Sequence, residues 1–213
     1  MTPQVALAPP PAFVESAFVD IASELGPPPL SGGAGARFTQ WSAHRQTLTG
    51  DVLLTACIAT PIPGWVDDMR PIVEGRTAGI MNAAAARVVG VPVETREESG
   101  HFVVRAAGAP VDTPRVGLAR TFLGWDASDV VTCFAACATP KVTARAGAAR
   151  GCDAAVLGAH LEGSKDPPPP GVALSALTWG VHHPSSAVTW ALSVAFALGV
   201  VAVACRKRQR SRI

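Results

Sequence analysis

Hydrophobic and polar positions change their spacing along the chain, and these changes predict where strands and helices lie. The segments WSAHRQTLTG and DVLLTACIATPIP are extended in pattern and meet at Gly50-Asp51, which predicts a β-hairpin. From about residue 65 to 89, apolar residues recur every three or four positions, as in a helix packed on one side. Gly90 and Pro92 are expected to end this helix.

Four further segments have strand-like composition and are mostly separated by short turns. Short connections favour antiparallel pairing, and the last segment is apolar almost throughout, which places it at the centre of a sheet. Residues 144–161 are rich in alanine and predict a second helix. The four segments are VPVETRE, HFVVRAA, RVGLARTFLGW and DVVTCFAACAT.

This order of elements predicts an α+β globular domain over residues 38–163. In such a domain an antiparallel sheet buries one face against a helix, here the single long helix. A proline-rich spacer and interfacial segment follows at residues 164–186 and includes a run of four prolines. Such a run favours a stiff polyproline II conformation that would hold the domain away from whatever follows.

An uncharged, apolar run occupies residues 187–205 and predicts a C-terminal single transmembrane helix. A helix over this run is about 28 Å long, close to the ~30 Å hydrocarbon thickness of a bilayer. We therefore expect a single-pass, C-terminally anchored protein whose partners include the lipid bilayer. The residues expected to form the anchor are Ala187, Trp190, Leu192, Phe196, Leu198, Val200 and Cys205.

Residues 206–213 form a basic tail, and its charge bears on orientation. Basic residues beside an anchor favour the cytoplasmic side, which would place the domain outside. The early part of the chain does not resemble a cleavable leader, because its first positive side chain is Arg37. We therefore expect a cytoplasmic main domain, with an exported domain carrying a C-terminal retention or sorting helix as the alternative. The basic flank comprises Arg206, Lys207, Arg208, Arg210 and Arg212.

The first 37 residues predict an amphipathic helix followed by a flexible linker. Residues 11–25 carry an apolar stripe that includes Phe13, Phe18, Ile21 and Leu25, with acidic residues on the other faces. An acidic helix of this kind docks in the groove of a partner protein or folds back onto its own domain. Both alternatives remain open from the sequence.

Four cysteines lie in the domain, and their state decides its chemistry. Cys57, Cys133, Cys137 and Cys152 form either two disulfides, in one of three pairings, or buried free thiols. Cys133 and Cys137 lie about 13 Å apart if both are on one strand, which is too far to share a metal ion. A site formed by Cys57, one of this pair and Cys152 remains geometrically open, but we expect no metal site and no cofactor.

Composition and motifs leave a binding protein as the main functional hypothesis. Hydrophobic residues make up 48% of the chain and charged residues 16%, and the formal net charge of +2 depends on the basic tail. Without a basic face elsewhere, nucleic acid is disfavoured as a partner. The sequence lacks the phosphate-binding, zinc-protease and nucleophile-elbow motifs. We expect a non-enzymatic membrane-anchored binding or adaptor domain with a protein partner, and a thiol or redox protein using the four cysteines as the alternative.

Overall fold

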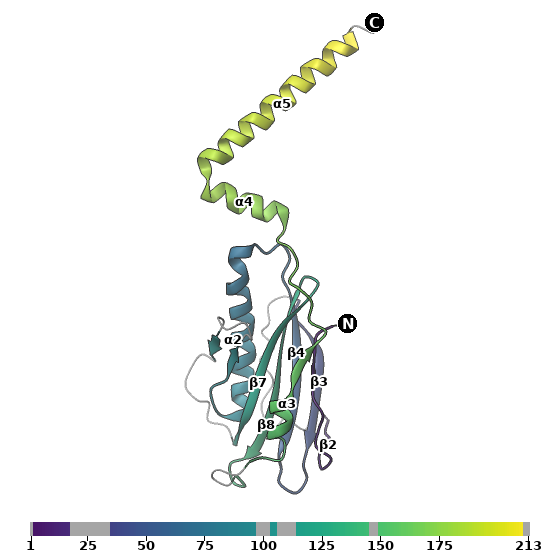
Figure 1. Ribbon diagram of the computed structural model, residues 1–213, viewed down its shortest axis with the longest axis vertical. Coiled ribbons are helices and arrows are strands. Elements are labelled where there is room, and N and C mark those ends of the chain that lie inside the picture. Colours follow the sequence, from purple (N-terminus) through teal and green to yellow (C-terminus); the bar gives the residue numbers. More distant parts are fainter. Residues whose placement is uncertain (1, 18–34, 97–102, 106–113, 145–148, 211–213) are drawn as a thin grey trace. The chain divides into compact units, whose positions relative to one another are not determined.

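The computed structural model describes residues 2–17, 35–96, 103–105, 114–144 and 149–210 of the chain. The chain divides into two compact units, one of residues 1–63 with 68–169 and the other of residues 64–67 with 170–213. The first unit contains sheets and helices together, so the predicted α+β class is confirmed. Figure 1 shows the elements of each unit with the labels used below.

A five-stranded antiparallel sheet forms the centre of the first unit, in the order β2-β3-β4-β8-β7. The predicted hairpin at Gly50 joins β3 to β4, and the glycine there has a φ of 73°. A second tight turn at Ala127 joins β7 to β8. The strands are β2 (Val14–Glu15), β3 (Arg37–Arg45), β4 (Val52–Pro61), β7 (Arg115–Asp126) and β8 (Asp129–Pro140).

Strands β4 and β8 are buried on both faces along nearly their whole length. Their register pairs Ala56 with Phe134 and Cys57 with Cys133. Because side chains alternate between the faces of a strand, these two adjacent pairs point to opposite sides of the sheet. One side forms a core around Leu54, Ala56 and Phe134, and the other a core around Leu53 and the cysteines.

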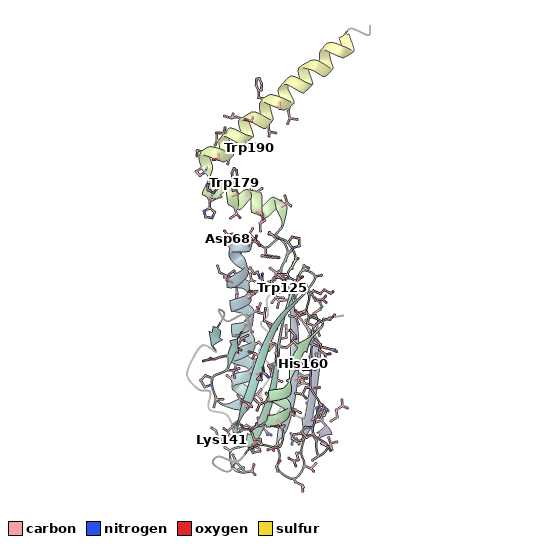
Figure 2. All side chains as sticks on the ribbon, viewed as in Figure 1. Asp68, Trp125, Lys141, His160, Trp179 and Trp190 are labelled. Carbon is pink, nitrogen blue, oxygen red and sulfur yellow. A yellow bond between two sulfur atoms is a disulfide. The ribbon has the colours of Figure 1, made fainter. Side chains whose placement is uncertain are left out.

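Helix α2 (Arg70–Val89) follows a short 3-10 turn (Asp67–Met69) and packs over β7 and β8. Pro71 is tolerated because it lies in the first turn, where no helical hydrogen bond is lost. Gly90 ends the helix in a left-handed conformation. The buried Glu74 joins the helix to the sheet, since it accepts hydrogen bonds from Arg70 and from the indole N–H of Trp125 on β7, each 2.9 Å long. Figure 2 labels Trp125.

Short segments from both ends of the first unit cover the other face of the sheet. Strand β1 (Gln4–Ala6) pairs antiparallel with β9 (His160–Glu162), and α3 (Asp153–Gly158) precedes β9. The side-chain amide of Gln40 on β3 holds β1 by bonding both the N–H and the carbonyl of Val5. The sequence did not predict β1 or β9, and the second helix is shorter than the predicted 144–161.

Two of the predicted strands form a separate hairpin. Strands β5 (Glu94–Arg96) and β6 (Val103–Arg105) pair only with each other, in a two-stranded sheet. All four predicted strands are therefore present and pair antiparallel as predicted, but only β7 and β8 belong to the central sheet. A buried hydroxyl fixes the hairpin: Thr95 donates to Asn82 on α2 over 2.9 Å and also bonds the hydroxyl of Thr121 on β7.

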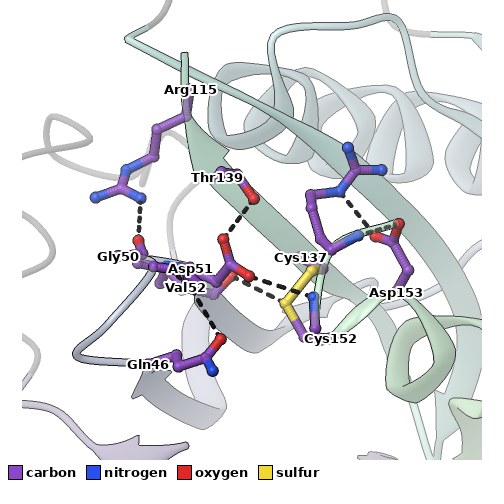
Figure 3. The surroundings of a disulfide bond; sticks show 12 residues. Gln46, Gly50, Asp51, Val52, Arg115, Cys137, Thr139, Cys152 and Asp153 are labelled. Carbon is purple, nitrogen blue, oxygen red and sulfur yellow. Dashed lines mark hydrogen bonds and ion pairs between the residues drawn. A yellow bond between two sulfur atoms is a disulfide. The ribbon is translucent and has the colours of Figure 1, made fainter. Parts of the chain in front are cut away.

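Two disulfides lie on the face of the sheet away from α2. Cys57–Cys133 joins β4 to β8 at a register pair, and Cys137–Cys152 joins β8 to the residue before α3. Polar bonds reinforce the second bridge (Figure 3), because the buried carboxylate of Asp51 accepts from the Thr139 hydroxyl and from the Gly151 N–H. The segment 150–153 is thus fixed to the ends of β4 and β8.

The N-terminal helix prediction is wrong where the structure describes it. Residues 11–17 are not helical, and Val14–Glu15 forms β2 by pairing with Arg45 and His44 of β3. The physical reason is that pairing with an open sheet edge gains ladder hydrogen bonds, which local periodicity does not reveal. Residues 18–25 of the predicted helix, including Phe18, Ile21 and Leu25, lie outside the described residues.

The second unit consists mainly of two helices, α4 (Val172–His182) and α5 (Pro184–Arg210). The sequence placed a spacer where α4 lies, whereas the apolar helix predicted over 187–205 lies within α5. The predicted transmembrane helix is nonetheless wrong, because no helix in the described part of the chain combines the length and hydropathy that crossing a membrane requires. The prediction rested on the absence of charged residues from positions 187–205. Helix α5 as a whole also contains Ser185, Ser186, Thr189 and Ser193 and ends in basic residues, which lower its hydropathy.

Removing either disulfide should lower the free energy of unfolding, because each bridge restricts the unfolded chain. Cys137–Cys152 closes a loop with a sequence separation of 15, and Cys57–Cys133 one of 76. The loop-entropy relation gives about 3 kcal/mol for the Cys137→Ala/Cys152→Ala double variant and about 4 kcal/mol for Cys57→Ala/Cys133→Ala. Urea unfolding of the full chain, followed by circular dichroism, measures both. Unchanged midpoints in both variants would contradict this account of the bridges.

Asp126 should show a small, pH-dependent contribution to stability. Its hydrogen bond with Lys165, at 2.5 Å, holds the pKa of this carboxyl below its ordinary value. A lowered pKa stabilises the folded protein at neutral pH, and the gain is lost as pH falls through the folded-state value. Because Lys165 is half exposed, we expect Asp126→Asn to cost less than about 1 kcal/mol at pH 7. The unfolding midpoints of the wild type and of Asp126→Asn should differ at pH 7 and become equal in acid. A difference between the two proteins that grows in acid would contradict this assignment.

Candidate functional site

A half-open apolar groove lies in the first unit, between α2 and the adjoining face of β3, β4 and β8. Most of its volume of about 450 Å³ is open to solvent, so it is a shallow groove and not an enclosed cavity. Strands β3, β4 and β8 form its floor, and one face of α2 forms its wall. The lining residues are Phe38, Ala56, Ile58, Thr60, Thr77, Ile80, Met81, Ala84, Thr132 and Phe134.

Strand register explains the floor of the groove. Ala56 and Ile58 lie two apart on β4 and so share a face. Ala56 is opposite Phe134 of β8, and Ile58 is opposite both Thr132 of β8 and Phe38 of β3. These side chains therefore form one continuous patch across three strands. A bulge in β3 between Phe38 and Gln40 shifts the register there and keeps Phe38 on the groove side.

Helical spacing explains the wall. Thr77, Ile80, Met81 and Ala84 recur at three and four residues, which puts them on one face of α2. The Thr77 hydroxyl donates to the carbonyls of Val73 and Glu74 in its own helix, at 3.0 and 3.1 Å. Its hydrogen-bonding capacity is used there, so it adds little polarity to the wall.

The groove offers apolar contact surface and no acidic or basic side chains. All ten lining side chains are uncharged, and seven of them are wholly apolar. Phe38 remains 37% exposed and packs edge-on against Trp41 with ring centroids 6.3 Å apart. Aromatic and methionine side chains are typical of the centres of protein interfaces. The groove can therefore bind apolar side chains but has no group that could act as an acid, base or nucleophile.

The structure brings the four candidate cysteines together on the opposite face of the sheet. All four have 0% exposure and are joined in the two disulfides. Bridged, buried sulfur atoms can neither act as nucleophiles nor bind a metal ion. Across the described residues, no group of three or more His, Cys, Asp or Glu side chains could hold a metal ion.

Among the described residues, no other predicted site residue lines the groove. Phe13 is buried with the cysteine side of the core instead of on a partner-binding helix. Trp190, Leu192, Phe196 and Leu198 are all exposed on α5, and Ala187 is partly exposed. The side chains of Val200, Cys205, Arg206, Lys207, Arg208 and Arg210 are not among those described, and Arg212 lies outside the described residues.

Sequence reasoning missed the groove, although it contained part of the signal. The stripe on α2 that includes Ile80 and Ala84 was predicted to be a packing face, and residues 51–63 were predicted to be one strand of a hairpin. The sequence could not show that α2 packs over β7 and β8, beside the face of β4 that carries Ala56 and Ile58. That placement of the helix on the sheet creates the groove.

Comparison with known proteins returned no match for this chain among family models, curated proteins or solved structures.

The disulfides predict the number of reactive thiols. Alkylation of the unfolded chain without reductant should modify Cys205 alone, because the other four sulfur atoms are bonded. Alkylation after reduction should modify all five cysteines. Mass spectrometry of the intact protein counts the added groups. Five modified cysteines before reduction would show that the bridges do not form.

Proposed function

We propose that this protein is a non-enzymatic binding module whose first unit holds an apolar segment of a partner polypeptide in the α2–sheet groove. The observation that carries the proposal is the uncharged lining that continues across β3, β4, β8 and α2. Burying apolar surface contributes about 25 cal/mol per Å², so even a few partner side chains would contribute measurable affinity. Phe38, on the rim, is a large apolar side chain already exposed for contact.

The rigidity of the floor supports a binding role. The groove residues of β4 and β8 alternate with Cys57 and Cys133, which are bonded across the same two strands. A floor that is fixed before binding loses little conformational entropy when a partner docks. The disulfides thus support the groove from the other side of the sheet.

The same disulfides favour an exported domain over a cytoplasmic one. Structural disulfides form and persist in oxidising compartments and are rare in the cytosol. We therefore place the first unit in an oxidising compartment as part of the proposal. The thiol or redox alternative receives less support, because thiol-disulfide exchange needs access to a sulfur atom and these four are buried.

Selection of short random peptides displayed on phage, with the full chain as bait, tests the proposal. We expect the selected peptides to be enriched in aromatic and branched aliphatic residues. Ile80→Asp should weaken their binding at least tenfold, because it places a carboxylate in the apolar wall. Ile72→Asp is the matched control, since Ile72 lies on the same helix, is 67% exposed and does not line the groove.

A second variant separates blocked binding from lost folding. Ala84→Phe should fill the groove with apolar bulk and abolish peptide binding without adding a charge. Urea midpoints of each variant show whether the fold persists. Equal peptide binding by the wild type, Ile80→Asp and Ala84→Phe would overturn the proposal, as would selected peptides that are mainly charged.

A further inference from the structure

The second unit exposes an unusual amount of apolar side chain. In the first half of α5, six large apolar residues are each more than 50% exposed, as listed at the end of this paragraph. They occur at every second position, so at about 100° per residue they surround the helix instead of forming one stripe. Contiguous exposed apolar patches on this scale mark interaction sites in soluble proteins. The six are Val188, Trp190, Leu192, Val194, Phe196 and Leu198.

Helix α4 adds apolar surface next to α5 in the chain. Leu174, Leu177 and Val181 recur at three and four residues and share one face, and Leu177 and Val181 are 68% and 78% exposed. Trp179 on α4 and Trp190 on α5 are also exposed (Figure 2). Tryptophan, which is apolar with one N–H group, is typical of the headgroup zone of a membrane.

Three hydroxyl groups of these helices are satisfied without water. Thr178 donates to the carbonyl of Leu174 at 2.9 Å, Thr189 to that of Ser185 at 2.9 Å, and Ser193 to that of Thr189 at 2.8 Å. Each hydroxyl is therefore satisfied by its own helix. Moving these three groups out of water leaves none of them unsatisfied, which lowers the cost of burying the surface around them.

The charge of residues 167–213 indicates what binds to the exposed apolar side chains of α4 and α5. Residues 167–213 contain no Asp or Glu, and five basic residues lie between positions 206 and 212. A second copy of the same helices would bring only more positive charge and no carboxylate. Anionic headgroups neutralise such a cluster and attract each Lys or Arg near the surface.

From these observations we infer that the second unit binds the surface of a lipid bilayer that carries anionic headgroups. The apolar face of α4 and one side of α5, which carries Val188, Leu192 and Phe196, contact the boundary between headgroups and acyl chains. The basic residues after position 205 contact the headgroups. This inference is independent of the peptide-binding groove, since none of the residues involved belongs to the first unit.

Flotation of the full chain with vesicles tests the inference. We expect binding to vesicles of phosphatidylcholine with phosphatidylglycerol to be at least tenfold stronger than to vesicles of phosphatidylcholine alone. Replacing all five basic residues between 206 and 212 by Gln should remove that difference. Phe196→Asp should weaken binding to both kinds of vesicle, because it puts a charge among the exposed apolar side chains.

Leu48→Asp is the matched control, because Leu48 is 92% exposed but belongs to the first unit. It should float with the vesicles as the wild type does, and so should the groove variant Ile80→Asp. Two results would overturn the inference. One is that the protein binds both vesicle types equally well, or binds neither. The other is a stable dimer without lipid that Phe196→Asp dissociates, since that would assign the apolar helices to a second copy.

Discussion

The pairing of β4 with β8 is the interaction on which the first unit depends. These two strands are buried on both faces, so every side chain in them must be matched by a layer above or below the sheet. Helix α2 supplies one layer, and β1, α3 and β9 supply the other. The Cys57–Cys133 bridge joins the pair at a register position, and this fixes which side chains face each layer.

The two layers cover the sheet unequally, and the proposed function follows from this difference. On the disulfide face, short segments are held by a second bridge and by the bonds of Asp51. On the other face, α2 lies over β7 and β8 and leaves Ile58 and Phe38 at the side of an apolar groove. A sheet that is rigid on one side and bordered by an apolar groove on the other is well suited to binding apolar groups.

Local sequence patterns were sufficient to predict the longest helices and strands. They were insufficient where a strand forms by pairing with a segment far away in the sequence. The hairpin at Gly50, the helix ending at Gly90 and strands β7 and β8 follow from spacing and turn residues that the sequence displays. Strands β1 and β9 are three residues each, and their pairing joins the two ends of the first unit, so no local signal marks them. Residues 11–17 carry helical spacing, yet Val14–Glu15 pairs with β3.

The candidate site was less predictable than the fold, because it arises from relative placement. The sequence showed the four cysteines but left three pairings and the free thiols open, and only the register that puts Cys57 opposite Cys133 distinguishes them. Predicting the groove would have required knowing where α2 packs relative to β4. Neither the composition of the chain nor the spacing of its apolar residues shows this. Apolar helical character in the second unit was visible in the sequence, but a run without charge was not enough to make α5 a membrane-spanning helix.

Methyl-selective NMR of the full chain, titrated with a peptide selected for binding, tests the central claim most directly. The claim is that the face of the sheet beside α2 holds the partner. The account predicts that chemical-shift changes concentrate on the methyl groups of Ile58, Ile80 and Met81, which line the groove. Changes concentrated instead on Leu53, Val131 and Val156, in the core on the disulfide face, would contradict it.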